Sequence, residues 1–258
     1  MQKIFKTVAL ILFCLLLGAG IGVLTLYKIQ ANSKMPTLTQ IQSLNNISPF
    51  LPSYIRETIH KSRLSTVKVV SLEPEYGVFS VATGTYITAE GRYFVLTVNH
   101  GVPGECQYTK INADGKFFRC IQFIELNIVA DYAIIEIDKI EGRKPIHISS
   151  VTPEGHQWKN VLSIMNKVYF TGFPNNIGPL TVSGEIIGYT GSGLIYVRAY
   201  AWAGSSGSAV FTSDGLLIGY VLAVDVGQSE YGQDVLEDIL LVAPAYQIDW
   251  SVIYNEEN

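Results

Sequence analysis

Short apolar runs alternate with turn residues over most of the chain after residue 63. The runs are rich in Val, Ile, Tyr, Phe and Thr, and Gly, Pro, Asn and Asp separate them, which is typical of strands joined by turns. No amphipathic helix lies between consecutive runs, and this argues against a parallel α/β sheet. The pattern predicts an antiparallel sandwich or barrel. The predicted strands are 66–71, 78–88, 92–97, 106–110, 117–126, 132–137, 160–164, 167–172, 181–190, 194–200, 208–212, 216–224 and 239–243.

A polar stretch divides this strand-rich region near its middle. Residues 141–158 read EGRKPIHISSVTPEGHQW and contain no sustained apolar run. The strands therefore fall into two halves of about six strands each. Ahead of them, PSYIRETIHKS at 52–62 opens with a proline and places Ile55 and Ile59 one helical turn apart, which predicts a short helix.

The N-terminal residues have a different pattern. Residues 7–27, TVALILFCLLLGAGIGVLTLY, carry no charge and follow Lys3 and Lys6. As a helix rising about 1.5 Å per residue, this run can cross the roughly 30 Å of a bilayer's hydrocarbon. It predicts a membrane-spanning helix or a signal peptide. The small residues GAG at 18–20 suit a cleavage site, but the apolar run continues beyond them, which favours an uncleaved anchor.

The charges around this run predict an orientation. Lys3, Lys6 and the free amine lie on the short N-terminal side, which places that side in the cytoplasm. We therefore expect a single-pass membrane protein with residues 1–28 as anchor, residues 29–51 as a polar linker, and residues 52–258 as a domain in the periplasm or outside the cell. The linker is rich in Gln, Asn, Ser, Thr and Pro, as tethers are.

Composition argues against a nucleic-acid-binding function and leaves the state of two cysteines open. Charged residues make up 16% of the chain, the net charge is −4 and no block of Lys or Arg stands out, so nucleic acid is not an expected partner. No His/Cys spacing resembles a zinc site, and we expect no metal or cofactor. Cys106 and Cys120 lie in the strand-rich part, where they are compatible with a disulfide in an oxidising compartment or with two free buried thiols.

Three residue types that act together in acyl transfer stand in separate motifs. His100 follows an apolar strand in YFVLTVNHGV, Asp131 precedes the strand of ADYAIIEI, and AGSSGSAV holds serines beside Gly204 and Gly207. A serine hydroxyl becomes a good nucleophile when an imidazole removes its proton and a carboxylate orients that imidazole. Backbone N–H groups on a tight turn can stabilise the oxyanion that forms.

These blocks resemble those of a known family. LTVNHGV, DYAIIEI and GSSGSAVFTSDGLLIGYV are similar to the His, Asp and Ser blocks of chymotrypsin-like serine peptidases, above all the bacterial HtrA-type branch, and occur in the same order. The likeness extends from PSYIRETIHKSRLSTVKV, which resembles the family's opening helix and first strand, to LLVAPAYQI at 240–248, which resembles its last strand and the start of a closing helix. HtrA-type proteins usually carry PDZ modules after this domain, and we expect none here.

The resemblance implies a fold and a set of roles. It implies two antiparallel six-stranded barrels, one over about 64–140 and the other over about 158–250, with a cleft between them. His100, Asp131 and Ser206 would be catalytic, and the N–H groups of Gly204 and Ser206 would form the oxyanion hole. Tyr200 would form the base of a shallow apolar pocket for small or medium aliphatic side chains, which would not favour Lys or Arg. The walls of that pocket would come from Val221, Leu222, Ala223 and Val224.

One residue departs from the family pattern. Ser208 stands where a second Gly is usual, and its Cβ is expected to crowd the backbone near a bound substrate, which counts against efficient catalysis. The function that the sequence favours is that of a membrane-tethered serine endopeptidase acting on polypeptides. The alternative is a catalytically silent peptidase-like domain that serves as a tethered binding or scaffolding module. An esterase of the α/β-hydrolase fold is disfavoured, because its serine would precede its acid and histidine.

Overall fold

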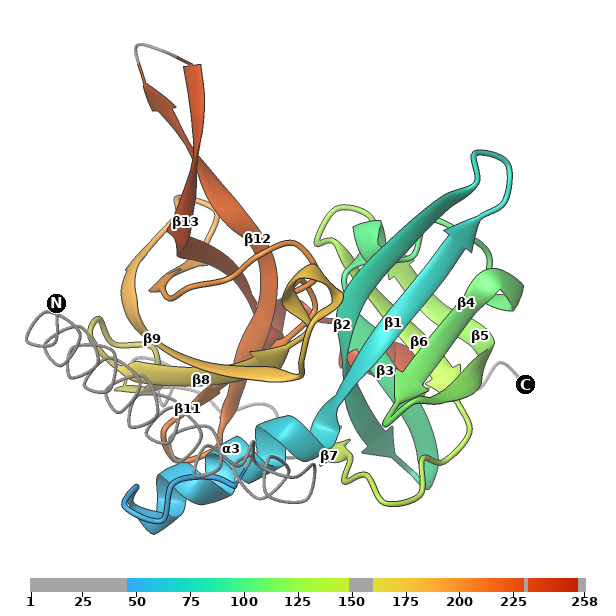
Figure 1. The fold of residues 1–258 in the computed structure, drawn as a ribbon, viewed down its shortest axis with the longest axis horizontal. Helices are drawn as coiled ribbons and strands as arrows, with labels where there is room; N and C mark the ends of the chain where they lie inside the picture. The colour runs from blue at the N-terminus through green and yellow to red at the C-terminus, as the bar shows by residue number, and fades with distance from the viewer. Residues whose placement is uncertain (1–45, 149–159, 230–231, 255–258) are drawn as a thin grey trace, which may run out of the picture. The chain divides into compact units, whose positions relative to one another are not determined.

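A computed structural model of the chain describes residues 46–148, 160–229 and 232–254, and it describes only the backbone of residues 224–229 and 232–237. Two antiparallel barrels and a short helix make up most of this region (Figure 1). The predicted anchor and most of the linker lie outside the described residues. Over the described residues, no helix is long and apolar enough to cross a membrane.

The first barrel is formed by the strands β1 to β6. They are hydrogen-bonded in the order β1-β4-β5-β6-β3-β2, and pairing of β2 with β1 closes the barrel. A further short strand, β7, pairs in parallel with β2 and is not part of the ring. The strands are β1 Thr66–Glu73, β2 Val78–Ala89, β3 Arg92–Thr97, β4 Thr109–Ala113, β5 Lys116–Asn127, β6 Tyr132–Ile137 and β7 Ile146–His147.

The second barrel is formed by the strands β8 to β13. Their order is β10-β13-β12-β11-β8-β9, and pairing of β9 with β10 closes the ring. The long hairpin of β12 and β13 extends beyond the ring, as Figure 1 shows. The strands are β8 Lys167–Gly172, β9 Leu180–Tyr189, β10 Ile195–Arg198, β11 Ala209–Thr212, β12 Leu217–Ser229 and β13 Gly232–Pro244. The prediction of two six-stranded antiparallel barrels is confirmed.

Each barrel encloses apolar side chains of the predicted strands. In barrel one, Phe94, Leu96 and Ile134 are at most 1% exposed. In barrel two, Val197 and Leu240 are fully buried. Removal of such side chains from water is the main favourable contribution to folding, at about 25 cal/mol per Å² of apolar surface.

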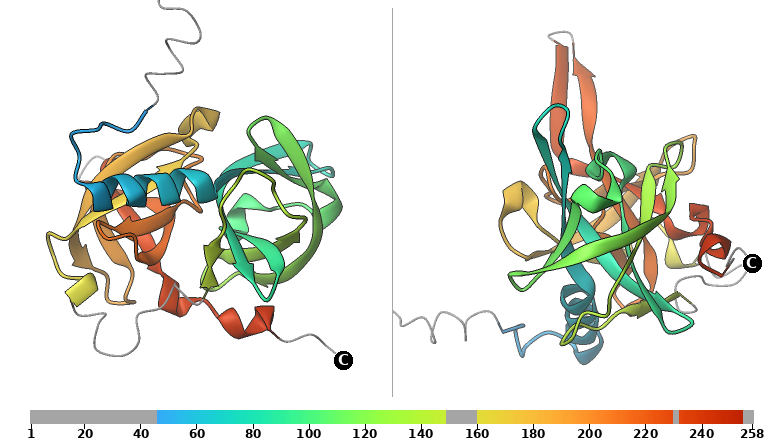
Figure 2. Two further views of the ribbon diagram at one scale, coloured as in Figure 1. Left: turned by 90° about the horizontal axis from the view of Figure 1, so that it is seen from below. Right: turned by 90° about the vertical axis from the view of Figure 1, so that its right-hand side faces the viewer.

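The helix α3, Ser53–Ser65, precedes barrel one in the chain but packs on barrel two. Ile55 and Ile59 lie against Tyr169 of β8. The Thr58 hydroxyl donates to the Ser213 carbonyl over 2.9 Å, beyond the end of β11. Figure 2 shows the helix along barrel two with its C-terminal end at β1. The predicted helix is confirmed and continues to Ser65, so the helix links the two barrels.

Three predicted elements were wrong. Residues 106–108 form the 3-10 helix η2, Cys106–Tyr108, and β4 begins only at Thr109, because the Tyr108 N–H donates to the Glu105 carbonyl over 2.9 Å. Residues 160–164 are not a strand: Asn160 and Val161 end a helical turn, and the Asn166 amide donates to both carbonyls. After β13, the expected closing helix is replaced by two 3-10 turns. These are η5 Ala245–Gln247 and η6 Trp250–Ile253.

Candidate active site

The first predicted site residue, His100, lies just after β3 on the rim of barrel one. The strand ends at Thr97, and His100 is the middle residue of the 3-10 turn η1, Asn99–Gly101. A Cβ on Gly101 would lie 2.7 Å from the Ala82 Cβ, so the turn packs too closely on β2 to hold a side chain there. The imidazole is directed outward, with 53% of its surface exposed.

Asp131 holds His100 by two hydrogen bonds. One carboxylate oxygen, Oδ2, lies 2.6 Å from Nδ1 of the imidazole, and the other, Oδ1, accepts from the His100 backbone N–H over 2.9 Å. The Asn99 N–H donates to the Asp131 carbonyl over 3.2 Å. Asp131 has a φ of +52°, a conformation that Asp tolerates better than most residues. The carboxylate therefore fixes the imidazole and leaves its Nε2 to exchange a proton with another group.

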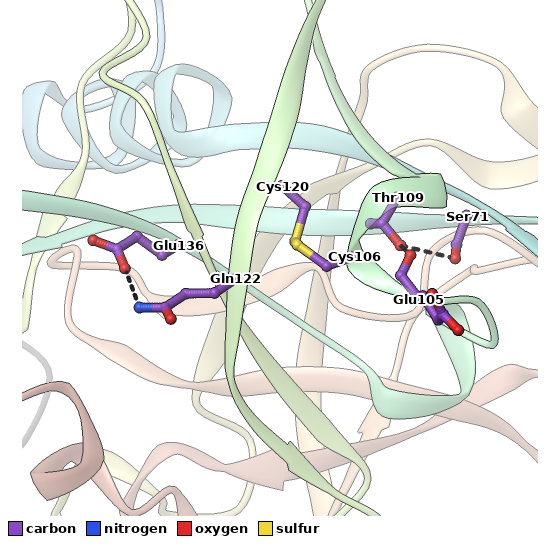
Figure 3. Close-up of a disulfide and its surroundings, with 7 residues drawn as sticks. All are labelled: Ser71, Glu105, Cys106, Thr109, Cys120, Gln122 and Glu136. Carbon is purple, nitrogen blue, oxygen red and sulfur yellow. Dashed lines mark hydrogen bonds between the residues drawn. A yellow bond between two sulfur atoms is a disulfide. The ribbon is translucent and has the colours of Figure 1, made fainter. Parts of the chain in front are cut away.

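The segment after His100 is fixed by a disulfide. Cys106 in η2 is bonded to Cys120 of β5, with their Cα atoms 5.3 Å apart (Figure 3). On the other side of η2, the hydroxyls of Thr109 and Ser71 lie 3.0 Å apart, and the Gly104 N–H donates to the Ser71 hydroxyl over 3.3 Å. Of the two states that the sequence left open for these cysteines, the structure has the bonded one.

The serine turn, residues 203–208, lies between β10 and β11 of barrel two. Gly204 and Gly207 have φ values of +94° and +88°, which only glycine adopts easily, so both are needed for the sharp turn. Ser205 is 3% exposed, and its hydroxyl accepts from the Trp202 N–H over 3.3 Å. Ser206 is half-buried, and its hydroxyl has no hydrogen-bond partner among the described residues, His100 included. Ser206 is thus the serine with an available hydroxyl.

Barrel one contacts this turn close to His100. The N–H of Thr83 in β2 donates to the Ser206 carbonyl over 2.9 Å. The Thr83 carbonyl accepts from the hydroxyl of Thr97, at the end of the strand that leads to His100, over 2.8 Å. These bonds bring Ser206 to the side of barrel one that carries His100 and Asp131. All three predicted residues therefore lie where the two barrels meet.

The carbonyl groups of Ala203 and Gly204 in the serine turn both accept hydrogen bonds from other segments of the protein. The Ala203 carbonyl accepts from the Asn175 N–H over 2.6 Å, and the Gly204 carbonyl accepts from the Thr83 hydroxyl over 2.7 Å. The backbone N–H groups of Gly204 and Ser206 have no acceptor among the described residues. Two available donors on a tight turn are what binding of an oxyanion requires.

The side chain of Ser208 does not lie on the exposed face of the serine turn. It is fully buried, and its hydroxyl donates to the Ser205 carbonyl over 2.6 Å. Gly172 of β8 lies opposite, and a side chain at that position would clash with the Ser208 hydroxyl. The expectation that Ser208 crowds a substrate was wrong, because its side chain is fully buried and the space it needs is left by a glycine.

The structure contradicts two of the residues predicted to form the substrate pocket, Val221 and Tyr200. Val221 is 1% exposed and packs in the core of barrel two, so it cannot line a pocket. Tyr200 is 59% exposed and stacks on Trp202 at 6.2 Å between ring centroids, whereas a residue at a pocket base would be enclosed. Leu222 is half-buried and packs against an apolar cluster to which both barrels contribute, and Ala223 is half-buried. The side chain of Val224 lies outside the described part of the chain.

Sequence reasoning missed Tyr220, which supports Asp131 from barrel two. This side chain in β12 is fully buried, and its hydroxyl donates to the carbonyl of Ala130 over 2.7 Å. Burial raises the pKa of Tyr220, and the nearby Asp131 carboxylate raises it further. The phenol stays protonated and fixes the residue next to Asp131. An apolar-looking strand gives no sign of this role, since only the tertiary fold brings the hydroxyl to Ala130.

Comparison with known proteins gives the family. The family model of the trypsin-like peptidase domain matches residues 82–219, which include His100, Asp131 and Ser206. This chain belongs to the trypsin-like peptidases. Among solved structures, this trypsin-like peptidase domain is similar to the serine endoprotease from Yersinia pestis, with a TM-score of 0.62. The alignment has 18% identity and covers 80% of this chain and 68% of that one, which shows a shared fold. No curated protein sequence matches the chain.

Proposed function

We propose that the protein is a serine endopeptidase that hydrolyses peptide bonds in polypeptides through His100, Asp131 and Ser206. The observation that carries the proposal is the pair of hydrogen bonds from His100 to Asp131, with Nδ1 lying 2.6 Å from the carboxylate. A carboxylate in this position selects the tautomer whose Nε2 can accept a proton and stabilises the imidazolium. Membership of a family of serine peptidases supports the same assignment.

The proposed reaction assigns a chemical role to His100, Ser206 and the backbone N–H groups of the serine turn. The Ser206 hydroxyl oxygen attacks the peptide carbonyl carbon while His100 Nε2 takes its proton, and the N–H groups of Gly204 and Ser206 bind the resulting oxyanion. The C–N bond then breaks, and His100 returns the proton to the leaving amine. Water attacks the acyl-enzyme by the same route, with His100 as base, and releases the acid product and Ser206.

The Ser206 and His100 side chains are not hydrogen-bonded to each other in the free protein. Catalytic hydrogen bonds are often long in free enzymes and shorten when substrate binds. The half-buried Ser206 and the exposed His100 are both accessible to such a substrate. The missing bond is therefore compatible with the proposed role.

Covalent labelling tests this function directly. A fluorophosphonate probe reacts with a serine that is activated by a base, and we expect it to label Ser206. Ser206→Ala should abolish labelling and lower peptide hydrolysis by at least about 1000-fold. Ser205→Ala is the matched control, because Ser205 is the adjacent buried serine, and it should keep most of the activity. Absence of labelling in the folded wild type would favour the silent scaffolding module instead.

We also propose that residues 7–27 remain in the mature protein and hold the peptidase domain outside the cytoplasm. The uncharged run behind Lys3 and Lys6 supports this. The Cys106–Cys120 disulfide supports an oxidising compartment for the domain. The intact mass of the protein purified from membranes should correspond to the full N-terminus, whereas an N-terminus beyond about residue 20 would indicate a cleaved signal peptide.

A further inference from the structure

Thr83 in β2 joins the two barrels through both its backbone and its side chain. Its N–H donates to the carbonyl of Ser206, and its carbonyl accepts from the Thr97 hydroxyl. Its own hydroxyl donates to the Gly204 carbonyl over 2.7 Å and accepts from the Phe173 N–H over 3.0 Å. Because Thr83 is fully buried, the loss of this hydroxyl would leave the buried Phe173 N–H and the partly buried Gly204 carbonyl without this partner.

The hydroxyl of Thr83 fixes the peptide group between Gly204 and Ser205. The carbonyl of this peptide group, that of Gly204, accepts from the Thr83 hydroxyl. Its N–H, that of Ser205, donates to the Trp202 carbonyl over 2.9 Å. This peptide group lies between the two whose N–H groups are proposed to bind the oxyanion. Since successive peptide planes share a Cα atom, its rotation would change the directions of the N–H groups of Gly204 and Ser206.

The same hydroxyl also fixes the segment that orients the Gly204 N–H. Phe173, whose N–H it accepts, leads into the 3-10 turn η4, Pro174–Asn176, where the Asn175 N–H donates to the Ala203 carbonyl over 2.6 Å. In a trans peptide, the C=O and N–H point in opposite directions. The contact of Ala203 with η4 therefore turns the N–H of Gly204 away from η4.

Close packing leaves little room for any other arrangement around Thr83. A side chain on Gly207 would clash with the Thr83 carbonyl, and a Cβ on Gly172 would lie 3.1 Å from the Thr83 hydroxyl. The backbone of β2 in barrel one is therefore in close contact with the backbone of the serine turn. The Thr83 hydroxyl is the side-chain group from β2 that reaches Gly204 across this contact.

We propose that Thr83 is a positioning residue of the active site, whose hydroxyl holds residues 204–207 in the conformation that can bind the oxyanion. The inference rests on the proposed peptidase function. A change in this turn would affect the transition state, in which the oxyanion exists, more than the bound substrate. Loss of the hydroxyl should therefore lower kcat and leave KM almost unchanged.

The test compares Thr83→Val, which keeps the shape of the side chain, with Thr83→Ser, which keeps the hydroxyl. For Thr83→Val we expect kcat per titrated active site to fall about 10- to 100-fold, since misplacement of catalytic groups by about 1 Å can cost 100-fold. KM should stay within about threefold, and Thr83→Ser should restore most of kcat. Thr83→Ala is a second variant without the hydroxyl, in case valine prevents folding.

Thr88→Val is the matched control. Thr88 lies in the same strand and is buried, but its hydroxyl donates to the Arg92 carbonyl at the β2–β3 turn. A general loss of stability would affect both variants, whereas loss of kcat should follow Thr83 alone. Equal kcat in Thr83→Val and wild type would overturn the proposal, and so would equal losses in the two valine variants.

Hydrogen exchange separates this proposal from the function on which it rests. Amides of residues 203–207 should exchange at least about tenfold faster in Thr83→Val than in Thr88→Val, whether or not the protein hydrolyses peptides. Failure of the fluorophosphonate to label wild-type Ser206 would overturn the peptidase function alone. Unchanged exchange at residues 203–207 would show that Thr83 does not hold the turn.

Discussion

The hydroxyl of Ser208 occupies the space that a side chain on Gly172 would need. Ser208 immediately precedes β11, Gly172 is the last residue of β8, and the Ser208 hydroxyl is held in place by its hydrogen bond to the Ser205 carbonyl. A serine at position 208 is therefore compatible with this fold because the residue opposite is a glycine.

Substitution of this pair should show strong coupling. Gly172→Ala should lower the free energy of unfolding by about 1–3 kcal/mol, because overpacking of a filled core is costly. Ser208→Gly should cost about 1 kcal/mol for the lost buried hydrogen bond. In the double variant the clash is relieved, so we expect a total loss at least about 1 kcal/mol smaller than the sum. Urea unfolding measures all four proteins, and additive losses would contradict the packing described.

The disulfide should stabilise the fold. Cys106 and Cys120 are separated by 14 positions, and a cross-link closing a loop of this length contributes about 3 kcal/mol. Reduction, or replacement of both cysteines by serine, should lower the free energy of unfolding by that amount. Thermal unfolding with and without reductant measures the effect. The double serine variant is the control, since reductant should not change its midpoint.

Glu136 should make stability depend on pH in the acid range. Hydrogen bonds from the Arg92 guanidinium, at 2.8 and 2.9 Å, lower the pKa of Glu136, burial opposes this, and the Gln122 amide adds to the lowering. The folded protein then binds this proton more weakly than the unfolded chain. The contribution is present above the ordinary glutamate pKa of about 4.3 and is lost as pH falls through the lowered value.

Glu136→Gln tests this dependence. At pH 7 the variant should be less stable than wild type by about 1 kcal/mol or less, as expected of a partly exposed pair. The difference should shrink as the pH falls below about 4. Denaturant unfolding between pH 3 and pH 7 measures this difference. A difference that stayed constant with pH would contradict the lowered pKa.

Val221 should affect stability and leave specificity unchanged. Its side chain is in the core of barrel two, so Val221→Ala should cost about 1–3 kcal/mol through lost burial and an unfilled space. The exposed Tyr200 should tolerate alanine with a change within about 0.5 kcal/mol. A peptide library cleaved by Val221→Ala should show the wild-type preference at the residue before the scissile bond. A changed preference would show that Val221 lines the substrate pocket and would contradict this prediction.

The local sequence determined most of the secondary structure and the types of the site residues. The short runs of Val, Ile, Tyr, Phe and Thr predicted most of the strands, because these residues favour strands and the Gly, Pro, Asn and Asp between them favour turns. The order of His100, Asp131 and Ser206 and the glycines beside Ser206 identified the three residues of the proposed site. These features depend on neighbouring residues or on motif order, and both can be read along the chain.

Features that depend on contacts between distant segments were decided only by the tertiary structure. Residues 106–108 were predicted as strand but follow the turn at Glu105 and the disulfide to β5. Ser208 was expected beside the substrate, and Val221 in a pocket, because motif alignment gives no side-chain direction. Thr83 and Tyr220 read as ordinary strand residues, yet each donates a hydrogen bond to a carbonyl of the other barrel. Every residue type has a backbone carbonyl, so no sequence pattern identifies the acceptors of these hydrogen bonds. The bonds form only because one barrel packs on the other.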